Sequence, residues 1–161
     1  MKAEARMKLR LKVLLLSGVI GALLWAQSAA AEAEKGSAAE VVLEGNYKVS
    51  SQEDFDRLIA ASGGGRFAIG GNLIIDHSSL TTLAGLEKLT SVGNFLFIEN
   101  NPALTSLAAL SNIKSIVGLN VRTNDSLTNL EGLNNLARVE RFMQIEGNPV
   151  LTSVAALSNL K

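Results

Sequence analysis

The 161-residue sequence contains no cysteine and only one histidine, one tryptophan and one tyrosine. Without cysteine the chain has no disulfides and no thiolate metal ligands, and a lipid anchor on an N-terminal cysteine is excluded. His77 has no second histidine near it, so we predict no metal site and no cofactor. No serine lies in a G-x-S-x-G elbow, and Gly63-Gly64-Gly65 lacks the Lys and Ser/Thr of a phosphate-binding loop. These absences predict a protein that is not an enzyme.

The N-terminal 31 residues have the pattern of a secretory signal peptide. Five basic residues precede an apolar run from Val13 to Trp25, and Ala29-Ala30-Ala31 supplies the small residues of a cleavage site. The run is shorter than the roughly 20 residues that a membrane-spanning helix needs. We predict cleavage after Ala31 and a mature protein that is secreted, periplasmic or at the cell surface, with translation starting at Met1 or Met7.

Removal of the leader changes the charge of the protein. The whole chain has 15 basic and 15 acidic residues, and the leader takes five of the basic and one of the acidic ones, which leaves 10 and 14, a net charge of −4. This balance argues against nucleic acid or an anionic membrane as a partner. Residues 32–40 are rich in Ala, Glu, Lys, Gly and Ser, and we predict a disordered spacer there.

The rest of the mature chain is repetitive. Leu80, Leu104, Leu127 and Leu151 hold the same place in successive copies, at spacings of 24, 23 and 24 residues. A fixed period in this range is typical of a solenoid, in which each repeat buries its apolar face against its neighbours. We predict a β-rich fold at residues 41–161: a right-handed parallel β-helix or leucine-rich-repeat-like stack of about four turns, with the repeats at 71–161.

Each repeat has two halves with different apolar periods. The first half alternates, as in Leu96-Phe97-Ile98-Glu99, which predicts a short strand with Leu96 and Ile98 inward. The second half has an apolar residue at every third position, as at Leu104, Leu107 and Leu110. Because an α-helix turns about 100° per residue, a stripe of period three would drift around it. We therefore expect short 3₁₀ or extended pieces joined by bends.

A recurring asparagine separates the two halves. Asn101, Asn124 and Asn148 each lie three residues before the leading leucine, and we predict that they turn inward and form a ladder of hydrogen bonds between successive turns. The first copy is one residue shorter and has His77 and Ser78 at this place, and we expect His77 to substitute for the asparagine. Asn124 also begins a glycosylation sequon, but it falls on the ladder.

Residues 41–70 differ from the repeats and predict an N-terminal cap. Ser50 or Ser51 offers a helix N-cap, with Glu53 or Asp54 at the capping-box position. The helix would cover the N-terminal end of the stack. Short strands are expected at 41–43 and 67–69. No such cap follows the last repeat before position 161, so we expect an uncapped strand edge there, covered either by a continuation of the chain or by another molecule.

The repeat pattern resembles a known family. The segment from Gly93-Asn94 to Ile116 carries G-N-x-L-x-I-x-x-N-P-x-L-T-S-L-x-x-L-x-N-L-x-S-V almost completely; residues 118–139 and 142–160 carry most of it, with Glu140-Arg141 in place of the corner Gly-Asn. This pattern is similar to the receptor L-domain, a relative of the leucine-rich repeat. The resemblance covers about residues 41–161 and implies an extracytoplasmic binding or cell-envelope protein, without naming a ligand. The receptor versions adjoin cysteine-rich segments and a kinase, which this sequence lacks.

Outward positions of the four expected strands form a candidate binding face. Its two columns are Ile74, Phe97, Asn120, Gln144 and Asp76, Glu99, Arg122, Glu146. Ile74 and Phe97 lie side by side and are suited to anchor a partner. Asp76 and Glu99 are expected about 5 Å apart, the spacing of a retaining glycosidase pair. Arg122 falls between Glu99 and Glu146, however, which favours a surface ion-pair ladder.

Three functions follow from these observations. The leading hypothesis is a non-enzymatic, extracytoplasmic module that binds a protein or cell-envelope ligand. The second is a structural or self-associating envelope protein that uses the C-terminal edge. The third and least favoured is a solenoid enzyme acting on polysaccharide, because such surfaces usually carry several aromatic side chains and the pattern places only Phe97 on this face.

Overall fold

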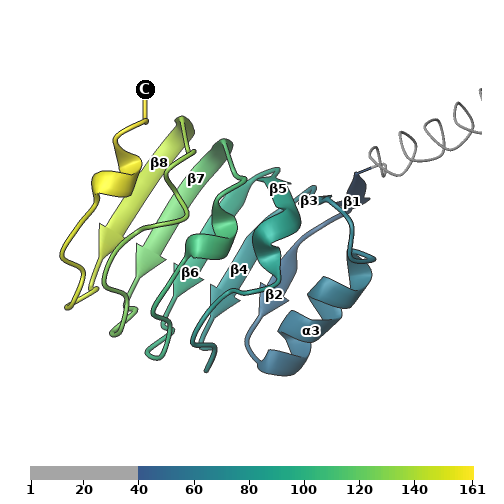
Figure 1. The fold of residues 1–161 in the computed structure, drawn as a ribbon, viewed down its shortest axis with the longest axis horizontal. Coiled ribbons are helices and arrows are strands. Elements are labelled where there is room, and N and C mark those ends of the chain that lie inside the picture. The colour runs from purple at the N-terminus through teal and green to yellow at the C-terminus, as the bar shows by residue number, and fades with distance from the viewer. Residues whose placement is uncertain (1–39) are drawn as a thin grey trace, which may run out of the picture. The chain divides into compact units, whose positions relative to one another are not determined.

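The computed structural model describes residues 40–161, so the predicted signal peptide and all but the last residue of the predicted spacer lie outside the described residues. The described chain is β-rich and forms two parallel sheets, one of order β1-β3-β5 and one of order β2-β4-β6-β7-β8 (Figure 1). The strands are β1 (Val41–Leu43), β2 (Tyr47–Val49), β3 (Phe67–Ile69), β4 (Leu73–Asp76), β5 (Leu89–Val92), β6 (Phe95–Glu99), β7 (Ser115–Arg122) and β8 (Arg138–Glu146). The helices are α3 (Gln52–Ala61) and three 3₁₀ segments, η1 (Leu86–Lys88), η2 (Ala108–Leu110) and η3 (Ala155–Leu157).

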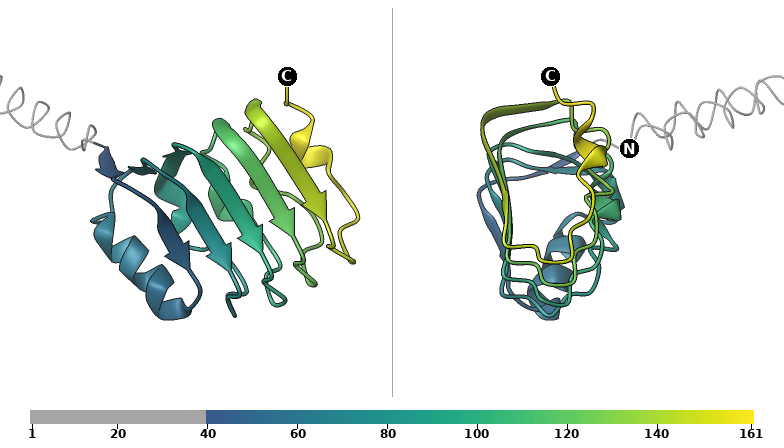
Figure 2. Two further views of the ribbon diagram at one scale, coloured as in Figure 1. Left: turned by 180° about the vertical axis from the view of Figure 1, so that it is seen from behind. Right: turned by 90° about the vertical axis from the view of Figure 1, so that its left-hand side faces the viewer.

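The five-stranded sheet keeps one register across the repeats. Leu73 pairs with Leu96, Leu96 with Leu119, and Leu119 with Met143, and every one of these pairings is parallel. Equivalent positions of successive copies therefore lie side by side on the sheet. Figure 2 shows the strands following one another from α3 toward the C-terminus.

The alternation predicted for the strands is confirmed in β6 and β4, and it is wrong in β7 and β8, where Asn120 is buried and Met143 is 45% exposed. Leu96 and Ile98 are fully buried, whereas Phe97 and Glu99 are only partly buried. The same pattern holds in β4, where Leu73 is buried. These inward side chains form one continuous core with the apolar residues of the second halves.

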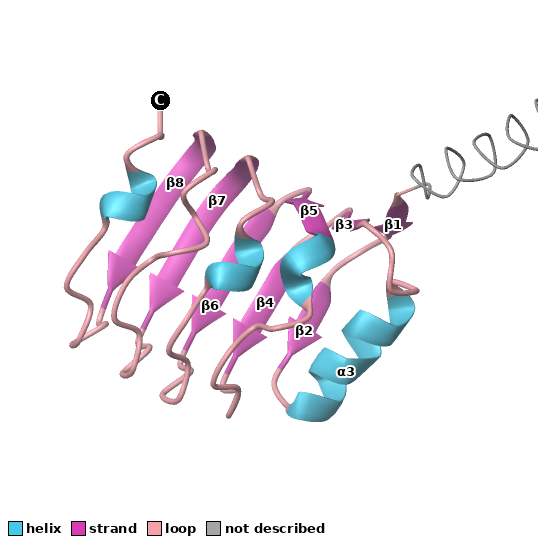
Figure 3. Ribbon diagram, viewed as in Figure 1, coloured by secondary structure: helices cyan, strands magenta, loops and turns pink. Residues whose placement is uncertain are grey.

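The second halves are short 3₁₀ pieces, turns and bends, as their period predicts. Leu104, Leu107, Leu110 and Ile113 are all fully buried although they are three residues apart. Only Ala108–Leu110 in this stretch is helical, and Leu110 N donates to Leu107 O to close its turn. Figure 3 shows the three 3₁₀ segments in a row alongside the strands. Breaking the helix after each turn keeps every third side chain directed at the core.

Glycine corners separate the strands of the early repeats but not of the later ones. A Cβ on Gly93 would lie 2.2 Å from Gly70 O, so only glycine allows the close approach that ends β5 and begins β6. In the next copy the corner sequence is lost, and Val117 N instead donates to Asn94 O. As a result β7 and β8 run through the corner as long strands, with a register shift after Ile116.

Helix α3 lies against β2 at one end of the five-stranded sheet (Figure 1). Its N-cap is Ser51, whose Oγ accepts a hydrogen bond from Asp54 N at 3.1 Å, and Asp54 Oδ2 accepts one from Ser50 N. Ser51 and Asp54 are thus the predicted N-cap and capping-box residues, with the return hydrogen bond made to Ser50 rather than to Ser51. Phe55 and Leu58 bury the apolar side of the helix. Among residues 40–161, no helix is both long enough and apolar enough to cross a membrane.

Candidate functional site

The outward face of the five-stranded sheet carries three rows of side chains that cross the strands. The first row is Phe95, Gly118 and Phe142; the second is Lys48, Ile74, Phe97, Asn120 and Gln144; the third is Asp76, Glu99, Arg122 and Glu146. The second and third rows contain the eight residues predicted for the binding face, in the predicted order. The first row was not predicted.

An aromatic cluster of Phe95, Phe97 and Phe142 occupies this face. The Phe95 and Phe142 rings are stacked with centroids 5.4 Å apart, and the Phe95 and Phe97 rings are tilted with centroids 5.8 Å apart. Phe97 is therefore not the single aromatic residue of the face, which corrects the expectation from the sequence. The signal was present, because Phe95 lies two residues before Phe97 and side chains two apart in a strand share a face.

Gly118 makes the ring stacking possible. It lies between Phe95 and Phe142 in the strand register. A Cβ at this position would lie 2.7 Å from Phe95 Cδ1 and 2.9 Å from Phe142 Cε1, closer than such atoms can approach. The two rings therefore close over the backbone of β7 and join the apolar surfaces of β6 and β8.

Asn120 lies next to Phe97 in the second row, but it is not the exposed residue that the sequence predicted. Only 6% of its surface is accessible. Its short side chain lies between the longer Phe97 and Gln144 in the register, which explains the burial. Its Oδ1 atom is buried and has no hydrogen-bond partner in the described residues. An orphaned buried acceptor of this kind carries a free-energy cost unless a ligand or water satisfies it.

Asp76 lies in a small polar network at the end of the third row. Its side chain is 16% exposed and contacts Lys48 Nζ at 3.2 Å, His77 Nδ1 at 2.6 Å and Asn100 Nδ2 at 3.0 Å. Burial raises the pKa of the Asp76 carboxyl, but the hydrogen bonds from Asn100, Lys48 and His77 together lower it by more, so the net pKa is below its ordinary value. A general acid in glycoside hydrolysis needs a raised pKa, and Asp76 has the opposite shift.

The predicted ion-pair ladder along the third row is only partly formed. Arg122 Nε lies 2.8 Å from Glu146 Oε1, an ion pair whose geometry is too poor for a hydrogen bond. Asp76 pairs with Lys48 and His77. Glu99, between these pairs, has neither an ion pair nor a side-chain hydrogen bond within the described residues. Arg122 reaches one neighbouring carboxylate only, so the ladder prediction is wrong at Glu99.

The asparagine ladder is present at the edge of this face. Asn101 Nδ2 donates to Asn124 Oδ1 and Asn124 Nδ2 donates to Asn148 Oδ1, both at 3.1 Å. Each asparagine also donates to a backbone carbonyl of the preceding repeat, as Asn124 Nδ2 does to Ile98 O at 3.0 Å. Asn124 is fully buried, so its sequon is closed to a glycosylating enzyme in the folded protein.

Ser78, rather than His77, continues the ladder into the first copy. Ser78 Oγ and N both donate to Asn101 Oδ1, at 2.7 and 3.0 Å, and Ser78 is buried. The His77 side chain is 72% exposed, which contradicts the prediction. The first copy lacks one residue between Ser78 and Leu80. Counting three residues back from Leu80, as in the other copies, therefore gives His77 instead of Ser78. His77 instead occupies a left-handed corner with φ 55°, as Asn100 does in the next copy.

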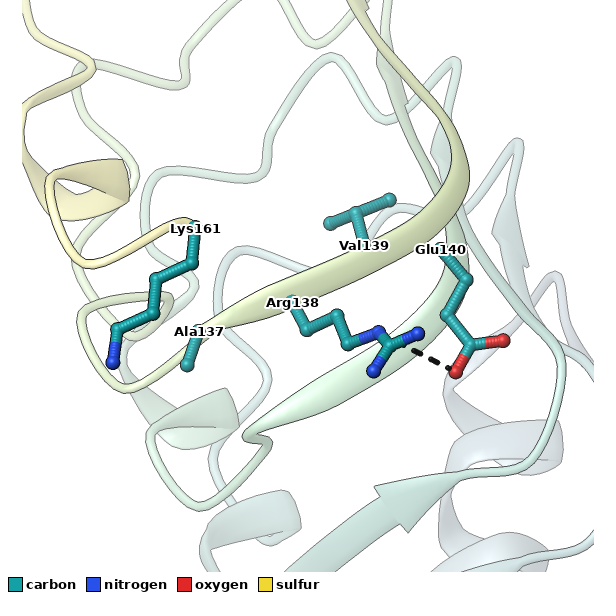
Figure 4. Close-up of a pocket in the computed structure, with 5 residues that line it drawn as sticks. All are labelled: Ala137, Arg138, Val139, Glu140 and Lys161. Atoms are coloured by element: carbon teal, nitrogen blue, oxygen red, sulfur yellow. Dashed lines mark ion pairs between the residues drawn. The ribbon is translucent and has the colours of Figure 1, made fainter.

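A shallow hollow lies at the N-terminal end of β8, next to Lys161. Its volume is about 570 Å³, and it is lined by Ala137, Arg138, Val139, Glu140 and Lys161 (Figure 4). The Arg138–Glu140 pair on its wall has an Nε to Oε1 distance of 3.8 Å, a weak contact between exposed groups. Within residues 40–161, no group of three His, Asp or Glu side chains is placed to hold a metal ion.

Comparisons of the chain with protein-family models, with curated proteins and with solved structures found no match.

Proposed function

We propose that this protein is an exported, non-enzymatic binding module that recognises a polypeptide ligand through the outward face of its five-stranded sheet. The observation that carries the proposal is the aromatic cluster of Phe95, Phe97 and Phe142, next to the apolar side chain of Ile74. Large aromatic side chains clustered on an accessible surface are the residues that most often dominate binding energy at protein interfaces. A charged row beside them provides the polar rim of such an interface.

The finer architecture that we propose is a solenoid similar to the receptor L-domain. Three observations support it: each strand pairs with the strand of the next copy, 3₁₀ segments recur, and Asn101, Asn124 and Asn148 form hydrogen bonds from one copy to the next. Stacked repeats of this kind present flat, extended surfaces to their ligands. Binding rather than catalysis is the expected use of such a surface.

Export is part of the proposal and rests on the leader at residues 1–31. Its test is the intact mass of the native protein recovered from outside the cytoplasm. A mass that begins at residue 32 supports cleavage after Ala31. Retention of the apolar run from Val13 to Trp25 in the mature protein would refute it.

Selection from a library of random twelve-residue peptides displayed on phage tests the binding face. We expect peptides enriched on the wild-type protein to lose about tenfold or more in affinity for Phe97→Ala, because a central aromatic side chain at an interface contributes about 2 kcal/mol or more. Phe97 is partly exposed, so the variant retains the core, and an unchanged far-ultraviolet circular dichroism spectrum is the control for folding. Peptides that bind wild type and Phe97→Ala equally, or failure of any peptide to enrich, would exclude this face.

A second candidate function, self-association, is favoured by the exposed edge of β8. Among residues 40–161 this strand pairs only with β7, and it is the last strand in the sheet order. The nearby side chains of Met143, Val150 and Val154 are 45%, 43% and 55% exposed. An unpaired strand edge next to exposed apolar side chains promotes pairing with another chain. A second copy of this chain is one partner that the edge fits.

A further inference from the structure

We infer that the outward face binds a basic side chain, arginine or lysine, of its polypeptide ligand at a site formed by Phe97, Glu99 and Asn120. This inference rests on the proposed binding function of the same face and specifies its ligand. The three residues are neighbours, because Phe97 and Glu99 are two apart on β6 and Asn120 pairs in register with Phe97 on β7. We call them the cation site.

Glu99 supplies an uncompensated negative charge. Its register neighbours are Asp76 and Arg122. Asp76 pairs with Lys48 and His77, and Arg122 pairs with Glu146. The basic side chains near Glu99 are therefore directed at other carboxylates. Within residues 40–161, the Glu99 carboxylate is thus an acceptor in the middle of the sheet that has no donor. A cation supplied by a ligand would complete the row of alternating charges.

Phe97 supplies a surface for the stem of the same side chain. Residues two apart in a strand are separated by about 7 Å on one face. Arginine and lysine have apolar stems that lie along aromatic surface while their charged ends reach polar partners. One basic side chain can therefore cover Phe97 and place its charge at Glu99, with a cation–π attraction where it crosses the ring.

Asn120 provides an independent observation at the same place. Its side chain is more than nine-tenths buried, and its Oδ1 has no hydrogen-bond partner in the described part of the chain. The Glu99 carboxylate and this amide oxygen both accept hydrogen bonds, and a guanidinium or ammonium group supplies several donors. Arg122 Nε, a donor on the same face that also makes no hydrogen bond within residues 40–161, lies 2.8 Å from Glu146 Oε1 and is paired with that carboxylate.

The charge of the whole protein favours the same ligand. The chain after residue 31 has a net charge of −4, which raises the association rate of basic partners and opposes acidic ones. The apolar side chains of Ile74 and Phe95 lie beside the cation site in the sheet. We therefore expect a ligand segment in which a basic residue has apolar neighbours.

The experiment uses peptides enriched on the wild-type protein. Each peptide is synthesised in two versions: one with its own arginine and lysine residues, and one in which citrulline replaces arginine and acetyl-lysine replaces lysine. These replacements keep the size of the side chain and remove its charge. Affinities for wild type, Glu99→Gln and Glu131→Gln are measured by isothermal titration. Glu131 is an exposed carboxylate outside the five-stranded sheet and without an ion pair in the described residues, so its variant is the matched control for net charge.

We expect the enriched peptides to contain a basic residue. The neutral replacement in the peptide and Glu99→Gln in the protein should each weaken binding about tenfold, and the two changes together should weaken it no more than one alone. Glu131→Gln should bind like wild type. Two results would overturn the cation site and leave the binding face intact: peptides that depend on Phe97 but contain no basic residue, or peptides equally bound by Glu99→Gln. Failure to enrich any Phe97-dependent peptide would overturn the face and the cation site together.

Discussion

Asn124 connects three successive repeats through its side chain. It donates to Ile98 O and to Asn148 Oδ1, and it accepts hydrogen bonds from the backbone N and the Nδ2 of Asn101. We expect Asn124→Ala to lower the free energy of unfolding by about 3 kcal/mol, because buried donors lose their acceptor. The measurement is urea denaturation followed by circular dichroism.

Asn148→Ala is the matched comparison for Asn124. Asn148 has the same place in the next repeat but is partly exposed, so water can replace its hydrogen bonds. We expect about half the loss that Asn124→Ala produces. Equal losses from the two variants would mean that burial does not set the strength of the ladder.

Asp76 couples the stability of the outward face to pH. Its pKa in the folded protein lies below the ordinary value of 3.8, so the folded state holds the proton less tightly than the unfolded state. This stabilisation is present above pH 4 or so and is lost as pH falls through the folded pKa. We expect the melting temperature of wild type to fall more steeply below about pH 4 than that of Asp76→Asn.

Glu131→Gln is the control for this pH experiment, because it removes an exposed carboxylate without an ion pair among residues 40–161. It should melt like wild type at every pH. Parallel curves for wild type and Asp76→Asn between pH 3 and 5 would show that the contacts of Asp76 do not favour its ionised form.

Single residues also mark the limit of reading the sequence. The asparagines recur at the same place in successive copies, so their ladder of hydrogen bonds could be predicted from the sequence. The role of Ser78 could not be predicted, because the one-residue deletion in the first copy can be placed on either side of it. Only the hydrogen bonds from Ser78 to Asn101 show which alignment is right. The burial of Asn120 is likewise invisible, because it depends on the sizes of neighbours that lie more than 20 residues away in the chain.

At the scale of the element, Gly118 in β7 decides how the aromatic cluster is built. We expect Gly118→Ala to destabilise the protein by only about 1 kcal/mol, because the Phe95 and Phe142 rings are at the surface and can turn away from a new Cβ. Separation of the rings should weaken the binding of Phe97-dependent peptides. Titration calorimetry and urea denaturation measure the two effects.

Gly65→Ala is the control for Gly118→Ala. A Cβ there would meet no atom within 4 Å, so the same chemical change should leave peptide binding unchanged. If both variants bind the peptides like wild type, the stacked rings are not required for recognition.

The strands differ in how well their sequences predict them. Alternation gives the buried face of β4 and β6 directly, and the capped helix α3 follows from Ser51 and Asp54. Strand β2 was not predicted, because its central lysine, Lys48, interrupts the apolar run that marks the equally short strands β1 and β3. The length of β7 and β8 was also missed. Both strands are long because their copies lack the glycine that ends β5 at Gly93. The need for glycine there follows from the close contact of Gly93 with Gly70 in the preceding copy, which the sequence alone does not show.

At the scale of the whole molecule, the two ends of the five-stranded sheet are unlike. Helix α3 lies against β2, whereas β8 has an open edge. In an antiparallel pairing of two copies of β8 centred on Phe142, Arg138 of one copy would lie beside Glu146 of the other. If self-association is a function of this edge, light scattering should give twice the monomer mass for wild type and the monomer mass for Met143→Glu.

Val42→Glu is the control for the self-association experiment. Val42 is also an exposed apolar residue on a short strand, but it lies in the other sheet, so its variant should keep the wild-type mass. A wild-type protein that remains monomeric at every concentration would exclude this use of the edge.

The constant register has a consequence for how the molecule can change in length. Each strand of the β4-β6-β7-β8 series contacts the strand that lies one copy away in the chain, so every loop that folding must close has about the same size and the same entropic cost. Insertion of a duplicate copy would add one strand and one ladder asparagine while leaving the contacts of the other copies unchanged. A chain built on this register can therefore gain or lose whole copies, and the outward face of the five-stranded sheet then widens or narrows by one strand for each copy.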